Sequence, residues 1–187
     1  MEFQVKVGVS NRHVHLTREV YDMLFDEEPM KIADLHQTGE FVTNQVVRVE
    51  GKQGMIENVK VLGPFRTYNQ VEISSSDAYK LGVCPPVRRS GDLEDSETVV
   101  LSTKKGKVTL KNSCILAQCH IHMNKEDLDT YHVKDKQVVD VIIEGKRPGI
   151  MKAHIKVSDH GVLEFHVDRD EASAFCLENG QSLRVIL

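Results

Sequence analysis

The feature that most constrains this chain is a His-x-His pattern that occurs twice. The segment RHVHL at residues 12–16 is matched much later by CHIHM at residues 119–123. Each histidine of the second pattern lies 107 residues after its counterpart in the first, His120 after His13 and His122 after His15. The two patterns therefore hold equivalent places in a repeat. In a strand, residues i and i+2 point to the same side, so the two histidines of each pair face one way. Each pair therefore predicts part of a metal site.

The repeat continues after the histidines at a shorter offset. VEGK at residues 49–52 matches IEGK at residues 143–146, and EISSSDA at residues 72–78 aligns with HVDRDEA at residues 166–172, both 94 residues apart. This alignment supplies a third ligand for each half. A single His-x-His is more often an ordinary strand than a metal site, but recurrence with matched third ligands favours metal binding. Three imidazole or carboxylate ligands are typical of a catalytic zinc with one open position. The predicted sites are His13/His15/Glu72 and His120/His122/His166.

Short β-type segments separated by glycine and proline dominate the rest of the chain. Alternating apolar residues predict a strand over residues 3–9, and further strands are expected near 41–49, 55–62, 69–73, 98–102, 107–116, 138–143, 153–157 and 162–167. Thr17, Ser74 and Asn124 are expected to cap short helices, and Asp170 is expected to precede a fourth.

The repeat and these patterns together predict the architecture. We expect a mainly β fold with short capping helices, in which an internal duplication gives two tandem, pseudo-symmetric small β-barrel domains. Residues 12–117 are expected to form the first barrel, and residues 1–11 with 118–187 the second, because the strand before each His-x-His is expected to pair with the other barrel.

Composition narrows the class of protein. The 187 residues are 40% hydrophobic, and no apolar run approaches the roughly 20 residues that a membrane helix needs. The start of the chain lacks the pattern of a secretion signal, so a cytoplasmic location is expected. A formal net charge of −4 argues against broad nucleic-acid binding. Four cysteines without C-x-x-C spacing are expected to be free thiols.

An arginine precedes one of the predicted ligands. Arg66 lies six residues before Glu72, at the entrance to a predicted strand. A guanidinium at that place fits a phosphate held bidentately beside the metal, and an ordinary surface arginine is the alternative.

Several linked segments in order resemble the PduL-type phosphate propanoyltransferases, a phosphotransacylase family. They are VGVSNRHVHL at residues 7–16, GP at 63–64 with Arg66, QVEIS at 70–74, SGDL at 90–93, HIHM at 120–123 and HVD at 166–168. The resemblance covers nearly the whole chain. It implies two β-barrel domains with a dinuclear zinc site between them, with acyl-CoA bound nearby and orthophosphate as the acceptor.

By matching positions, the resemblance gives one zinc to His13, His15 and Glu72 and the other to His120, His122 and His166. It gives the phosphate to Arg66. We expect Arg89 and Ser90, beside Gly91, to contact the phosphates of CoA, on the basis of local charge and the Ser-Gly-Asp turn.

The chain departs from the family pattern in two places. The family usually has Lys-Arg where this chain has Gln118-Cys119, and Thr where it has Asn69. Family members in bacterial microcompartments usually carry an N-terminal targeting extension. This chain begins almost at the first predicted strand, so a free cytoplasmic enzyme is expected.

The function expected is an acyltransferase that interconverts a short-chain acyl-CoA, propanoyl or acetyl, and phosphate with acyl phosphate and CoA. Phosphate attacks directly, with two zinc ions per chain. The same residues leave two alternatives open: a dinuclear zinc hydrolase, and a non-catalytic metal-containing binding or scaffold relative. The resemblance is compatible with a homo-oligomer and with metabolic coupling to an acyl kinase.

Overall fold

The computed structural model describes all 187 residues, with fourteen strands and four helices. The chain divides into two compact units, residues 12–117 and residues 1–11 with 118–187. Each unit has its own hydrophobic core, one including Val14 and Val71 and the other including Ile121 and Phe165. Separate cores are what two domains require.

The unit made of residues 1–11 and 118–187 is a closed six-stranded barrel. Its strands follow the order β1-β13-β10-β12-β11-β14, and β14 pairs with β1 to close the ring. The elements are β1 (Glu2–Ser10), β10 (His120–Met123), α3 (Lys125–Tyr131), β11 (Val138–Ile143), β12 (Gly149–Val157), β13 (Glu164–Asp168), α4 (Arg169–Phe175) and β14 (Ser182–Ile186).

The unit made of residues 12–117 also contains a ring of six strands. The order β4-β5-β2-β6-β9 is closed by β8, which pairs with both β9 and β4, while β3 and β7 lie at the sides. The elements are β2 (His13–His15), α1 (Arg18–Leu24), β3 (Lys31–Asp34), β4 (Phe41–Glu50), β5 (Met55–Gly63), β6 (Gln70–Ile73), α2 (Ser75–Leu81), β7 (Val87–Arg88), β8 (Glu97–Ser102) and β9 (Lys107–Ala117).

The two rings repeat the same strand pairings. β2 is parallel to β5 and antiparallel to β6, just as β10 is parallel to β12 and antiparallel to β13. β9 is parallel to β6, and β1 is parallel to β13. The predicted fold class, mainly β with two pseudo-symmetric barrels and short helices, is confirmed.

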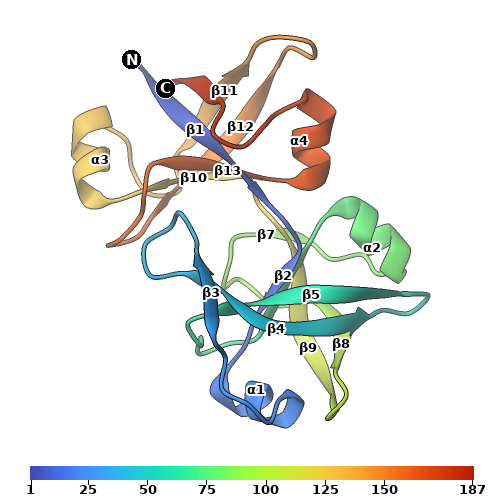
Figure 1. Cartoon of the computed structure of the whole chain (residues 1–187). Coiled ribbons are helices and arrows are strands. Elements are labelled where there is room, and N and C mark those ends of the chain that lie inside the picture. Colours follow the sequence, from blue (N-terminus) through green and yellow to red (C-terminus); the bar gives the residue numbers. More distant parts are fainter. The chain divides into compact units, whose positions relative to one another are not determined.

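The strand that precedes each His-x-His belongs to the other unit. β1 comes before β2 in the chain but pairs with β13 and β14, and β9 comes before β10 but pairs with β6 and β8. In Figure 1 the blue strand β1 lies among the orange and red strands of its barrel. The chain therefore enters the other unit directly before each histidine pair.

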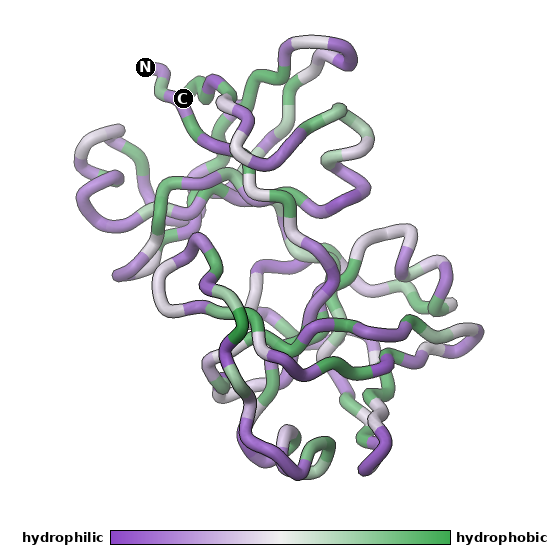
Figure 2. Tube along the Cα trace, in the orientation of Figure 1, coloured by the Kyte–Doolittle hydropathy of each residue, from purple (hydrophilic) through white to green (hydrophobic).

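Alternation along the strands decides which side chains fill the barrels. In β1, Phe3, Val5 and Val7 are buried, while Gln4 and Lys6 between them are exposed. Figure 2 shows hydrophobic and hydrophilic residues alternating along the strands. The period of two sends every second residue into a core and leaves its neighbours for solvent or for a site.

All four helices have seven residues and begin at a side-chain cap. Thr17, Ser74 and Asn124 cap α1, α2 and α3, as predicted. The prediction for α4 was wrong, because the helix is capped by Asp168 and not preceded by Asp170. Asp168 and Glu171 exchange hydrogen bonds with each other's backbone N–H at 2.8 Å, and this capping box fixes the start of the helix at Asp168. The short strands β3 and β7, and the last strand β14, were not predicted.

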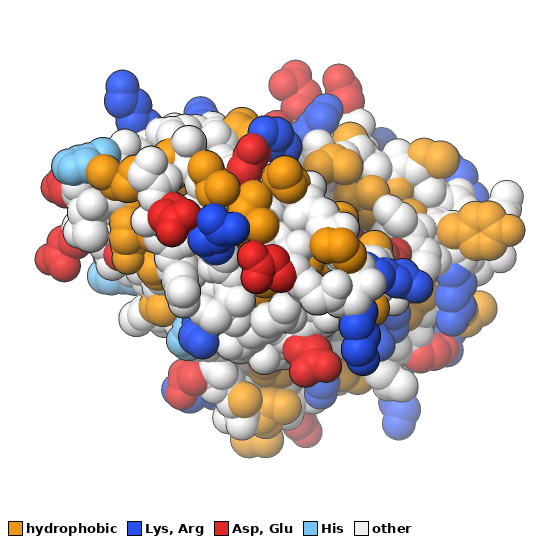
Figure 3. Space-filling view, turned by 90° about the horizontal axis from the view of Figure 1, so that it is seen from above, with side chains coloured by type: hydrophobic (Ala, Val, Ile, Leu, Met, Phe, Trp, Pro, Cys, Tyr) orange, Lys and Arg blue, Asp and Glu red, His pale blue; other side chains and the backbone are white.

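None of the four helices has the length and apolar character that crossing a membrane would require. On the face drawn in Figure 3, acidic and basic side chains are interspersed among hydrophobic ones. Many surface charges pair, for example Lys125 with Asp159 at 3.0 Å. Exposed pairs of this kind contribute only about 0–1 kcal/mol each, so the two cores carry the stability.

The repeats differ at one buried charge. In the first repeat the Arg12 guanidinium binds both oxygens of Asp77, each at 2.8 Å. The equivalent residues in the second repeat are Cys119 and Glu171. The Cys119 thiol packs against the core and donates to the Lys152 carbonyl at 3.1 Å. Glu171 has no guanidinium at this place.

The lack of that cation has a consequence for Glu171. Burial raises the pKa of its carboxyl from 4.5 to about 7, and the negative charges of Asp168 and Asp170 act in the same direction. The hydrogen bond from the Asp168 backbone N–H lowers the pKa in part. Ionised Glu171 is therefore less favourable in the folded chain than in the unfolded chain.

This asymmetry predicts a pH dependence of stability. Between pH 4.5 and 7 the folded chain binds more protons at Glu171 than the unfolded chain, so this contribution to the free energy of unfolding falls as pH rises. After allowance for partial exposure, Glu171 should lower the free energy of unfolding of the wild type by about 1–2 kcal/mol as pH rises. Glu171→Gln should not show this decrease. Urea unfolding of metal-free protein at pH 5 and pH 8 measures it.

Two further variants make this measurement specific. Cys119→Arg should flatten the same pH dependence, because it supplies the cation that Arg12 supplies to Asp77. The exposed carboxylate variant Glu178→Gln is the matched control and should behave as the wild type. An identical pH slope in the wild type and in Glu171→Gln would contradict the prediction.

Candidate metal centres and the arginine beside one of them

The first His-x-His and Glu72 meet across one pair of strands. β2 and β6 are antiparallel, with His13 opposite Glu72 and His15 opposite Gln70. The His13 Nε2 atom lies 3.5 Å from Glu72 Oε2, and the His13 and His15 rings are edge to face with centroids 4.9 Å apart. One nitrogen or oxygen from each of His13, His15 and Glu72 lies within 4.8 Å of the others. The intervening Val14 is fully buried in the core.

The second His-x-His meets His166 in the same way. β10 and β13 are antiparallel, with His120 opposite His166 and His122 opposite Glu164. The Nε2 atoms of His120 and His122 are 2.9 Å apart, and the His122 and His166 ring centroids are 4.5 Å apart. One ring nitrogen from each of His120, His122 and His166 lies within 4.8 Å of the others. Ile121 points to the core, as Val14 does.

Both triads fit a divalent metal ion. Tetrahedral zinc with Zn–N distances of about 2.0 Å holds two nitrogens about 3.3 Å apart, close to the separation of the two Nε2 atoms. The His120 Nδ1–H donates to the Gln118 carbonyl at 2.6 Å, which places the lone pair of this ring on Nε2, the nitrogen that faces His122. Imidazole nitrogens and a carboxylate are the donors that zinc takes. Neither triad needs a large rearrangement to accept the ion.

Two residues that the sequence reasoning missed support the third ligand of each triad. Gln70 is fully buried and donates from Nε2 to Glu72 at 2.5 Å. Glu164 is 7% exposed and accepts a hydrogen bond from the His166 Nε2 at 2.5 Å. The numbers 164 and 70 differ by 94, so the second offset of the repeat was the signal that could have found both.

Arg66 lies beside the first triad and is held at several points. Its backbone N–H donates to the carbonyl of Leu16, the residue after His15. Its guanidinium donates from Nη1 to Tyr68 and Ser90 at 2.9 and 3.1 Å, and from Nη2 to Glu40 at 2.7 Å. These contacts fix the orientation of a cation that is partly exposed.

A chain of hydrogen bonds joins Arg66 to the metal ligand Glu72. Ser90 Oγ accepts from Arg66 and also from Gln70 Nε2, at 2.8 Å. The same Gln70 amide group donates to Glu72, and its Oε1 accepts the backbone N–H of Gly91 at 2.7 Å. The two acceptor positions of Ser90 Oγ are thus used, and its O–H hydrogen remains as a donor. Arg66, Ser90, Gln70 and Glu72 form one connected network.

The residues predicted to contact CoA, Arg89 and Ser90, lie in the segment that follows β7. Ser90 is part of the network just described, next to Arg66, and the Arg89 carbonyl accepts the Asp92 N–H at 2.9 Å. Contact of Arg89 and Ser90 with CoA stays a prediction.

The buried thiols are poor nucleophiles. Burial raises the pKa of Cys114 to about 12 and that of Cys119 to about 12, in both cases with help from nearby carboxylates. Both stay protonated at neutral pH, and the thiolate is the reactive form.

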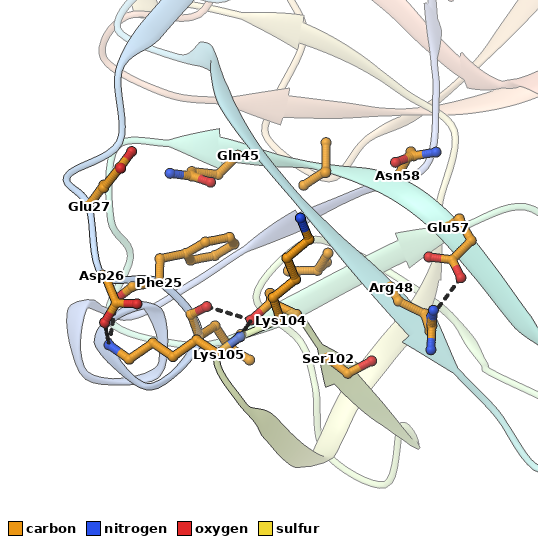
Figure 4. A pocket seen from close by; sticks show the side chains of 14 residues that line it. Phe25, Asp26, Glu27, Gln45, Arg48, Glu57, Asn58, Ser102, Lys104 and Lys105 are labelled. Carbon is orange, nitrogen blue, oxygen red and sulfur yellow. Dashed lines mark hydrogen bonds and ion pairs between the residues drawn. The ribbon is translucent and has the colours of Figure 1, made fainter.

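A separate cavity of about 630 Å³ lies in the unit of residues 12–117 (Figure 4). None of the predicted site residues lines it. Its walls pair their own charges, Arg48 with Glu57 at 2.6 Å and Lys105 with Asp26 at 2.9 Å, while Lys104 points into it.

Comparison with known proteins identifies the family of the chain. The family model for phosphate propanoyltransferase matches residues 6–178. A phosphate propanoyltransferase of Thermotoga maritima is 46% identical over 184 residues, which is 96% of this chain and 88% of that protein. Those of Priestia megaterium and Clostridioides difficile are 42% and 40% identical, covering 95% and 97% of this chain and 83% and 88% of theirs. With a family match over most of its length and a site built from the same linked segments, the chain belongs to the phosphate propanoyltransferase family of acyltransferases.

Proposed function

We propose that this chain catalyses the reversible reaction of a short-chain acyl-CoA, propanoyl or acetyl, with orthophosphate to give acyl phosphate and CoA. The observation that carries the proposal is the connected network of Arg66, Ser90, Gln70 and Glu72. It places a guanidinium suited to phosphate beside a triad suited to a metal ion. The family of the chain supports the same reaction class.

The two triads each hold one zinc ion in this proposal, so the chain carries two. Zinc at these ligands supplies Lewis-acid chemistry, which lowers the free energy of bringing an anion to a carbonyl group and stabilises negative charge on oxygen. His120 offers Nε2 because its Nδ1–H is held by the Gln118 carbonyl. Gln70 orients Glu72 through an N–H donor and adds no charge.

Arg66 binds the phosphate. A guanidinium donates two parallel hydrogen bonds to a phosphate, and Glu40, Tyr68 and Ser90 hold this one in place. The Ser90 O–H hydrogen supplies another donor at the same place. Positioning of this kind lowers the entropy that the two substrates lose on the way to the transition state.

A phosphate oxygen attacks the thioester carbonyl carbon directly. The new C–O bond gives the acyl phosphate, and the C–S bond breaks to release CoA. No side-chain nucleophile is needed, which agrees with the raised pKa of Cys114 and Cys119. Isolation of an acyl-thioester on either cysteine during turnover would overturn this mechanism.

Release of CoA should depend on phosphate. Purified protein mixed with propanoyl-CoA should release free thiol at a rate that rises with phosphate and falls to background without it, because phosphate is the attacking group. A thiol reagent follows the release, and acyl phosphate is trapped with hydroxylamine. Rapid CoA release without phosphate would instead identify a zinc hydrolase, since metal-bound water is itself a nucleophile.

Metal content should follow the two triads. We expect two metal ions per wild-type chain, and one in His13→Ala and in His120→Ala, because each substitution removes a ligand from one triad only. Activity should fall by about 100-fold or more in both variants. Elemental analysis with the CoA-release assay checks this, and His160→Ala, at an exposed histidine outside both triads, is the control. Equal and negligible turnover in wild type and His120→Ala would favour a non-catalytic scaffold.

Arg66→Ala should raise the KM for phosphate. Loss of a charge-assisted bidentate contact is worth about 1.5–3 kcal/mol, or roughly 10- to 100-fold. Arg66→Lys should recover only part of this, because an ammonium lacks the fork geometry. Steady-state kinetics with varied phosphate measures it, with Arg48→Ala, an arginine of the same unit paired with Glu57, as control. An unchanged KM in Arg66→Ala would remove Arg66 from the site.

A further inference from the structure

Glu164 is a buried carboxylate that contacts a proposed metal ligand. It lies two residues before His166 on β13, and its Oε2 atom is 2.5 Å from the His166 Nε2. We propose that Glu164 is a positioning residue that holds the N–H of His166 at Nε2, so that the ring presents Nδ1 to the metal. This inference rests on the proposed metal site.

The neighbouring strand indicates which edge of the His166 ring faces the triad. β13 lies between β1 and β10, and Gly8 of β1 is the partner of His166. A Cβ on Gly8 would lie 2.8 Å from His166 Cδ2, so the edge with Cδ2 and Nε2 faces β1. In imidazole, Nδ1 lies on the opposite side of Cγ from Cδ2. The Nδ1 edge therefore faces β10, which carries His120 and His122.

A carboxylate can act only as an acceptor when ionised, which fixes the tautomer. Glu164 accepts from the His166 Nε2, so this nitrogen carries the hydrogen and the lone pair is on Nδ1. A metal-bound imidazole whose other nitrogen donates to a carboxylate is a better ligand, because the carboxylate raises its basicity.

Gly8 provides the room for this arrangement. Its missing Cβ would lie 2.7 Å from Glu164 Cδ and 3.0 Å from Glu164 Oε1, closer than such atoms normally approach. Glycine inside a strand weakens the strand, so a glycine there is explained by a close approach of other atoms. The side chains of Glu164 and His166 are those atoms.

The two repeats differ in whether the carboxylate belongs to the third ligand or to the residue that supports it. In the first, the ligand Glu72 is a carboxylate and the supporting Gln70 is an amide; in the second, the ligand His166 is an imidazole and the supporting Glu164 is a carboxylate. Each triad with its support thus contains one carboxylate. Placing the charge behind the ligand keeps the second site favourable for a divalent cation while all three ligands are imidazoles.

The test reads metal binding separately from activity. In the His13→Ala background, which leaves only the second triad intact, Glu164→Ala should weaken zinc affinity roughly 10- to 100-fold in competition with a chromophoric chelator. Glu164→Gln should lose less, because its amide oxygen still accepts from His166. The matched control Glu144→Ala, an exposed carboxylate of the same unit, should leave the affinity unchanged. Melting temperatures of the metal-free variants show whether they fold.

Ring ¹⁵N chemical shifts of the zinc-loaded protein provide the second measurement. We expect zinc on Nδ1 and hydrogen on Nε2 for His166, and the reverse for His120, whose Nδ1–H is held by Gln118. Gly8→Ala should weaken zinc binding as Glu164→Ala does, because the new methyl group displaces both side chains.

The outcomes separate this inference from the proposed function. Zinc bound through His166 Nε2, or equal affinities in wild type and Glu164→Ala, would overturn the positioning role and leave the proposed reaction standing. If the second triad binds no zinc in a protein without substitutions, both the positioning role of Glu164 and the proposed function with two zinc ions are overturned.

Discussion

The register of two antiparallel strand pairs is the constraint on which the rest of the site depends. β2 on β6 and β10 on β13 both place the first histidine of a pair opposite the third ligand. A shift of one residue would turn every ligand to the core and bring Val14 or Ile121 into its place. The buried valine and isoleucine therefore fix the histidines, because their burial sets which face of the strand is free for a metal.

Around this common frame the two repeats have specialised. The first repeat adds Arg66 and the hydrogen bonds through Ser90 and Gln70, which support the proposed phosphate site. The second repeat has three imidazole ligands and a carboxylate behind one of them. One backbone arrangement thus supports two different sites, because the side chains two positions before the third ligand differ.

The same comparison explains the departure at Cys119. Arg12 neutralises Asp77 at the start of α2, and the equivalent Glu171 at the start of α4 has only helix-cap hydrogen bonds. The Cys119 side chain points into the barrel core with Ile121, away from the face of His120 and His122. The residue therefore bears on the environment of Glu171 and not on the proposed metal ligands directly.

The sequence by itself determined the repeat, most of the strands, three of the four helix caps and the sets of residues that form the triads. Those features depend on local periodicity and on matched positions, which can be read along the chain. Only the tertiary structure decided that Gln70 and Glu164 support the triads, that Ser90 joins Arg66 to Glu72, and that Asp168 caps α4. Hydrogen bonds between side chains from different segments, and the space left by Gly8, depend on distances that only packing fixes.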